Sequence, residues 1–198
     1  MSEAHWATPF KWNRRAAEAG EERFVFPSMC DPFDNEVLPA WRRRFFELME
    51  DTPHLTWLLL TKRPQNIAKM CAEAGGLPRN AAYGATVVTQ KEAARDIPFL
   101  IRAENTQFPR FLFLSVEPMQ EEMHIELWLK LRIDWVICGG ESGPRPRAMH
   151  ADWARSLRDQ CAHAGVPFFF KQWGGRTPKA NGKELDGREW CERPALAA

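Results

Sequence analysis

Residues 110–118 read RFLFLSVEP, a short apolar stretch that ends in the polar residues Ser115 and Glu117. Five other segments have the same form, and helical spacing of apolar residues follows most of them. Their apolar positions are continuous rather than alternating, which is typical of parallel strands buried on both faces. The other segments are FVFPSMCD (24–31), TWLLLTKRP (56–64), AAYGATVVTQ (81–90), DWVICGGES (134–142) and VPFFFKQWG (166–174).

The repeated strand–helix unit predicts the fold class. Strand starts recur at about the length of a β/α unit, roughly 25–35 residues. We therefore expect an α/β fold: a partial TIM-like (β/α) barrel with about six parallel strands and flanking helices. Six units close only part of an eight-unit barrel, so an open doubly wound sheet, or completion by another element or chain, remains an alternative.

The chain has no long linker, which predicts one α/β domain over residues 1–198. We expect residues 1–23 to be an irregular N-terminal arm, with a short helix at 13–19 at most. Residues 174–198 are rich in Gly, Pro and charge, and they predict a surface-wrapping tail anchored by Trp190. The run Arg42–Arg44, on a predicted helix at 36–50, is typical of a solvated helix face.

The composition indicates an ordinary soluble protein. The net charge is +1, so bulk electrostatics favours neither a nucleic acid nor a membrane as partner. The five cysteines form no CxxC pair, which predicts reduced thiols and no metal site. The beginning of the chain has no apolar core of a signal peptide, and the longest apolar runs are too short to cross a bilayer. We therefore expect a cytoplasmic protein that does not contact a membrane.

Polar residues follow each predicted strand, and parallel strands place their carboxyl ends at one rim. Glu117 and Glu141 are the candidate acid and base, because carboxylates at strand ends can donate, accept or hold a cation. For Glu117, an ion pair with Lys62 or Lys171 is the alternative. The remaining polar strand ends are Ser28, Asp31, Thr61, Thr86, Thr89, Ser115, Ser142 and Gln172.

The loop CGGESGP at 138–144 is the sharpest local motif. Gly139 and Gly140 come directly after a strand, where glycine lets the backbone approach a ligand closely. Glu141 could then hold an ammonium or a ribose hydroxyl, with Ser142 beside it. The alternative is a glycine-dependent turn with a solvated carboxylate. Neither a dinucleotide-binding nor a P-loop fingerprint is present.

Cations also occur at the predicted rim. Lys62 and Lys171 could neutralise a phosphate or carboxylate, or they could balance rim carboxylates in a structural network. Arg63, Arg145 and Arg147 are candidates for contact with an anion or a nucleic acid. Lys11, Arg14 and Arg15 could extend the same nucleic-acid contact.

The motifs together resemble a phage- and prophage-associated family of unknown function that is often described as radical-SAM-like. The resemblance covers nearly the whole chain, and the GGESG and FFFKQWG blocks are its most specific parts. The matching stretches are PFKWNRR (9–15), VFPSMCDPFD (25–34), TPHLTWLLLTKRPQN (52–66), FLSVEPM (113–119), WVICGGESGPRPRAMHADWARSLRDQC (135–161), GVPFFFKQWGG (165–175) and GKELDGREW (182–190).

The resemblance implies a partial TIM-type barrel. Longer members of the family begin with a cysteine-rich loop that holds a [4Fe–4S] cluster for cleavage of S-adenosylmethionine. This sequence lacks that segment, so no iron–sulfur cluster is expected in it. By resemblance, Gly139, Gly140 and Glu141 would hold the amino group of S-adenosylmethionine. Ser115, Glu117 and Lys62 would then contact its ribose or carboxylate.

These observations favour a phage-type protein that binds a ligand or a partner, with reduced or no radical chemistry. The partner would be a host or phage protein or a second copy of the chain. The alternative is an enzyme dependent on S-adenosylmethionine or a nucleotide that acts on nucleic acid and is completed by a partner subunit. A third hypothesis is a cluster-free hydrolase or transferase that uses Glu117 and Glu141.

Overall fold

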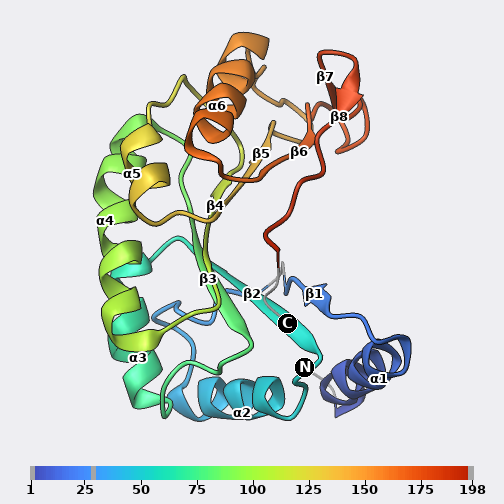
Figure 1. Ribbon diagram of the computed structural model, residues 1–198, viewed down its shortest axis with the longest axis vertical. Coiled ribbons are helices and arrows are strands. Elements are labelled where there is room, and N and C mark those ends of the chain that lie inside the picture. Colours follow the sequence, from blue (N-terminus) through green and yellow to red (C-terminus); the bar gives the residue numbers. More distant parts are fainter. Residues whose placement is uncertain (1–2, 28–29, 196–198) are drawn as a thin grey trace.

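A computed structural model describes residues 3–27 and 30–195 of the chain, so the strand-end residue Ser28 lies outside the described residues. Six parallel strands form one sheet in the order β1-β2-β3-β4-β5-β6, and the sheet curls into half a barrel (Figure 1). A doubly wound sheet would reverse its strand order at a switch point, so the partial barrel is confirmed. The strands are β1 (Arg23–Val25), β2 (Leu55–Thr61), β3 (Ala81–Thr86), β4 (Leu112–Val116), β5 (Trp135–Gly139) and β6 (Phe168–Gln172).

Helices cover the convex face of the sheet (Figure 1). Alternate strand residues such as Leu114, Val136 and Phe170 point outward into the main core, which the helices complete. No helix in the described part of the chain is both long and apolar enough to span a membrane. The helices after β1 are α2 (Pro39–Glu50), the short 3₁₀ helix η1 (Pro64–Asn66), α3 (Ile67–Glu73), α4 (Gln90–Gln107), α5 (Glu126–Leu131) and α6 (Ala151–Ala164).

Aromatic side chains fill the concave face. Phe113 and Trp135 are buried there, with ring centroids 6.1 Å apart, and Phe111 lies 6.3 Å from Trp135. Phe24 of β1 and Phe169 of β6 pack against this cluster from the two edges of the sheet. The concave face therefore has an aromatic core of its own, separate from the main core under the helices.

The expectation of an irregular arm at residues 1–23 is wrong for most of that segment. Residues Glu3–Ala19 form the helix α1. Trp6 is buried, with its ring centroid 5.8 Å from Trp41 and 6.4 Å from Phe45 of α2. This tertiary packing outweighs the poor helix propensity of Pro9 and the polar composition that suggested a loop.

The expectation of a solvated face for the arginine run is wrong for Arg42, which is only 1% exposed. Its Nε donates to the Pro32 carbonyl at 2.7 Å, and Nη2 donates to the Val37 carbonyl at 3.3 Å. Arg43 and Arg44 are exposed, as predicted. A buried guanidinium therefore holds the connection between β1 and α2.

The C-terminal segment covers one edge of the sheet. After the short hairpin of β7 (Glu184–Leu185) and β8 (Arg188–Glu189), the chain runs antiparallel to β6. The Phe170 amide donates to the Trp190 carbonyl at 2.8 Å, and the Glu192 amide donates to the Phe168 carbonyl at 3.3 Å. The segment then passes along the open side of the sheet towards β1 (Figure 1), where the Arg193 guanidinium lies 5.8 Å from the Phe24 ring.

Candidate functional site

A cavity of about 610 Å³ lies at the carboxyl ends of the strands, where the sequence placed a polar rim. The structure thus brings together residues from five strand ends that are far apart in the sequence. The predicted site residues that line it are Lys62, Glu117, Gly140, Glu141, Ser142, Arg147 and Lys171.

Glu117 forms the centre of the rim. Its Oε2 lies 2.8 Å from the Lys171 ammonium, and its Oε1 accepts a hydrogen bond of 3.1 Å from the Ser115 hydroxyl. Ser115 and Lys171 belong to the inward-facing set of side chains on β4 and β6. The ion pair with Lys171 is therefore present, and both of its members still line the cavity.

Glu141 pairs with Arg147 in the loop after β5. Arg147 Nε donates to Glu141 Oε2 at 2.5 Å, the Arg147 amide donates to the same oxygen at 3.1 Å, and Nη1 donates to Gln120 Oε1 at 2.6 Å. The Arg147 hydrogen bonds lower the pKa of Glu141. A carboxylate that stays ionised in this way suits the binding of a cation or hydroxyl better than proton donation.

The glycines of this loop are required by a contact between two chain segments. The Gly140 amide donates to the Gln172 carbonyl at 2.9 Å, so it is already used. A Cβ at Gly140 would lie 2.0 Å from the Trp173 carbonyl oxygen, and one at Gly139 would lie 3.0 Å from Glu117 Oε2. Gly140 therefore lets the β5 and β6 loops meet, which is the turn-type role that the sequence left open, and Gly139 leaves room for the Glu117 carboxylate.

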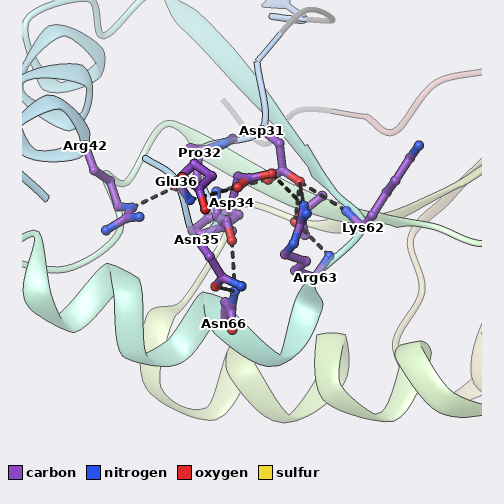
Figure 2. Close-up of polar contacts among 11 residues, drawn as sticks. Asp31, Pro32, Asp34, Asn35, Glu36, Arg42, Lys62, Arg63 and Asn66 are labelled. Atoms are coloured by element: carbon purple, nitrogen blue, oxygen red, sulfur yellow. Dashed lines mark hydrogen bonds and ion pairs between the residues drawn. The ribbon is translucent and has the colours of Figure 1, made fainter. Parts of the chain in front are cut away.

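Lys62 and Arg63 are neighbours in sequence but lie in different surroundings (Figure 2). Arg63 reaches Asp34 at 2.8 Å and Asp31 at 3.5 Å, so its charge is compensated within the β1–α2 connection. Figure 2 shows the Lys62 side chain pointing away from that network. Among the described residues, the Lys62 ammonium has no acidic partner, and it lines the rim cavity.

The other predicted basic contacts do not form one surface. Arg145 is exposed but is not part of the cavity wall. Lys11, Arg14 and Arg15 lie on α1, where Asn13 Oδ1 accepts a 2.8 Å hydrogen bond from the His54 amide just before β2 begins. These three residues are therefore near the amino end of the sheet, far along the strands from the rim, and cannot extend the Arg145 surface.

Several residues of the cavity wall were not among the predicted site residues. The sequence signal for one of them is Thr89-x-x-Glu92, because Thr89 Oγ1 caps α4 by accepting from the Glu92 amide at 3.2 Å. Glu92 Oε2 in turn accepts from the Val88 amide at 2.9 Å. The capping pattern thus places the first turns of α4 at the rim. Thr86 and Gln172 were expected at the rim as polar strand ends, and the residues missed are Val88, Glu92, Arg95, Asp96, Pro118, Gln120 and Pro178.

The donor groups of the chain do not fit an iron–sulfur cluster. Cys71, Cys138 and Cys161 are buried on separate elements, Cys30 is half-buried and Cys191 is exposed. Burial raises the pKa of Cys71 and Cys161 to about 12, which opposes formation of the thiolates that ligate iron. Within residues 3–27 and 30–195, no group of three or more His, Cys, Asp or Glu side chains is arranged to hold a metal ion.

The chain was compared with known protein families and with curated proteins. It belongs to a family described as "Protein of unknown function (DUF5131)", which matches residues 1–194. The comparison with curated proteins finds no match. The match confirms a family of unknown function over nearly the whole chain, and the description of that family names no activity.

Proposed function

We propose that this member of the DUF5131 family binds a small ligand of the S-adenosylmethionine class, with an amino-acid group and a ribose, in the rim cavity. The observation that supports this most is the Lys62 ammonium, which has no acidic partner among the described residues and lines the same cavity as the carboxylates of Glu117 and Glu141. A cavity of about 610 Å³ is of a size that takes a nucleoside-sized molecule.

The charges of the cavity wall favour a zwitterionic ligand. Arg95 pairs with Asp96 at 2.7 Å, and Arg147 and Lys171 have the carboxylate partners given above. Among the described cations of the wall, Lys62 is the one without a carboxylate partner, and the carboxylate of a ligand could pair with it. The Arg147 amide and Nε both donate to Glu141 Oε2, so Oε1 of that carboxylate, which accepts no hydrogen bond from the described residues, is open to a ligand ammonium.

Binding is a better-supported role than acid–base catalysis by the two carboxylates. Glu141 has a lowered pKa because of Arg147, and Glu117 is occupied by Lys171 and Ser115. Association with phages and radical-SAM-like ancestry are further parts of this proposal, and they rest on the motif resemblance alone.

The alternative function is an enzyme that acts on nucleic acid and is completed by a partner subunit. The specific observation in its favour is a second cavity of about 630 Å³ on the concave side of the sheet. It shares Glu117 and Lys171 with the rim cavity, so a second substrate could lie next to the first.

Isothermal titration calorimetry tests the binding proposal with S-adenosylmethionine, S-adenosylhomocysteine and adenosine monophosphate. We expect Lys62→Met to weaken binding of all three by about tenfold or more, because each loses a charge-assisted contact. Glu141→Gln should weaken only the two ligands that carry an ammonium group. Lys11→Met removes an exposed lysine on α1 and should change nothing.

Absence of ligand binding by the folded wild-type protein would contradict the proposal. If the wild-type protein shows cooperative thermal unfolding but no heat of binding and no thermal shift with any of the three ligands, the proposal is wrong. Equal weakening by Lys62→Met and Lys11→Met would show that the effect is one of net charge and would reject Lys62 as a contact.

A further inference from the structure

Two loops that are distant in sequence leave the rim side by side. The Gly175 amide donates to the Glu141 carbonyl at 2.8 Å, and the Gly143 amide donates to the Gly175 carbonyl at 3.0 Å. Ser142 and Gly175 form a parallel bridge, so both loops run in the same direction beyond it. A Cβ at Gly174 would lie 2.1 Å from the Glu141 carbonyl oxygen, which shows how closely the two backbones approach.

Three exposed cations follow this junction: Arg145 on one loop and Arg176 and Lys179 on the other. We call them the basic strip. Among the described residues, none of the three has an acidic partner, whereas Arg63, Arg95, Arg147 and Lys171 all have one. The basic strip thus has positive charges without carboxylate partners in the described chain. The cations that line the neighbouring cavity all have such partners, except for Lys62.

The two loops hold the basic strip close to the rim cavity and place almost no acidic side chains beside it. Pro178, between Arg176 and Lys179, is itself part of the cavity wall. Pro144 and Pro146 flank Arg145 and restrict its backbone. Residues 140–147 and 173–183 contain a single carboxylate, Glu141, and Arg147 binds it. The three positive charges are therefore exposed to solvent on the two loops that leave the rim cavity.

From this geometry we propose that the basic strip binds the phosphate backbone of a single-stranded nucleic acid lying across the mouth of the rim cavity. Phosphodiesters offer one negative charge per nucleotide, which matches a row of unpaired cations better than an isolated anion does. A single strand can follow two uneven loops, whereas a duplex is stiff and keeps its bases stacked away from the cavity. The inference deepens the proposed function and rests on it for one point only, that the strand would lie next to the bound ligand.

Fluorescence anisotropy tests the proposal with labelled single-stranded DNA and RNA of the same short sequence, without any small ligand. Contacts to three phosphates predict that log K falls with log [salt] with a slope of about −2. The triple variant Arg145→Ala/Arg176→Ala/Lys179→Ala should lose at least tenfold in affinity and most of that slope. Lys11→Ala/Arg14→Ala/Arg15→Ala, which removes three exposed cations from α1, is the matched control and should keep both.

The outcomes separate this proposal from the binding of the small ligand. Loss of strand binding in the strip variant, with calorimetric binding of S-adenosylhomocysteine retained, supports the basic strip. Strand binding by a wild-type protein that takes no small ligand also supports it, while rejecting the proposed function. Equal loss in the α1 control, tighter binding of duplex than of single strand, or equally tight binding of polyglutamate would overturn it.

Discussion

At the scale of single residues, neighbours of the same chemical type have different roles. Lys62 and Arg63 follow the same strand, yet the Arg63 guanidinium pairs with Asp31 and Asp34 while the Lys62 ammonium has no acidic partner in the described chain. The difference comes from the β1–α2 connection, which is folded against the end of β2. Its Asp31 side chain accepts hydrogen bonds from the Thr61 hydroxyl and the Lys62 amide, while the Lys62 ammonium points away from it (Figure 2). A rim cation is therefore available to a ligand only where the preceding connection leaves it unpaired.

The buried thiols predict how stability changes at high pH. Desolvation raises the pKa of Cys71 from about 9.0 to about 12. The neutral thiol stabilises the fold fully below pH 9, and this contribution is lost as the pH rises from 9 towards 12. We expect the free energy of unfolding to fall by up to ~1.4 kcal/mol per pH unit for each such thiol.

Urea denaturation at a series of pH values between 8 and 11 measures this effect. Cys71→Ala should lower stability below pH 9 but give a shallower decline above pH 9, because one titrating thiol is gone. Cys191→Ala, at an exposed thiol, should leave the slope unchanged. Parallel declines for the wild type and Cys71→Ala would contradict the expectation.

At the scale of elements, the connection between β1 and α2 depends on the helix that follows it. Arg42 of α2 reaches back to two carbonyls of the connection, at Pro32 and Val37. Asn66 of η1 supports the same segment by donating to the Phe33 carbonyl at 3.0 Å (Figure 2). These polar contacts from α2 and η1 therefore hold Asp31 and Asp34 in position at the rim.

Arg42→Met should lower the free energy of unfolding by about 3 kcal/mol, because it leaves two carbonyls of the connection without their charged donor. Arg43→Met is the matched control: Arg43 is exposed, and its single hydrogen bond goes to the Glu73 carbonyl at 3.3 Å. We expect a change within about 0.5 kcal/mol for this control in urea denaturation. Similar losses for the two variants would refute a special role for Arg42.

The elements and part of the site could be predicted from sequence for a common reason. Apolar runs define buried strands, and parallel strands bring their ends together, so Lys62, Glu117 and Lys171 could be placed at one rim. The role of Gly140 could not, because its partner loop at 173–175 is distant in sequence. Helix α1 was missed because the aromatic partners of Trp6 lie on another helix.

At the scale of the whole molecule, the β6 edge of the sheet is covered by the chain itself. The segment after β8 pairs with β6 and covers that edge, and Trp190 holds the segment in place. The Trp190 indole donates to the Leu185 carbonyl at 3.0 Å, and the Arg188 guanidinium lies 3.4 Å from its ring centroid. Covering an edge strand in this way prevents pairing with other chains.

Trp190→Ala should therefore have two effects. Lost packing should lower the free energy of unfolding by about 3 kcal/mol, and loosening of the segment should expose the β6 edge and promote self-association. Urea denaturation and light scattering at increasing protein concentration measure the two effects. Trp12→Ala, at a side chain that is 40% exposed on α1, should show neither. A destabilised but strictly monomeric Trp190→Ala protein would contradict the role in edge protection.

The consecutive strand order also bears on how the protein is made. Each strand from β2 to β6 pairs with the strand before it in the chain, so each of them meets a partner already synthesised when it leaves the ribosome. Each pairing closes a loop of only one β/α unit, which keeps its entropic cost small. During synthesis, the last strand formed is an uncovered edge that can pair with other chains. This risk ends when the segment around Trp190 leaves the ribosome and covers β6.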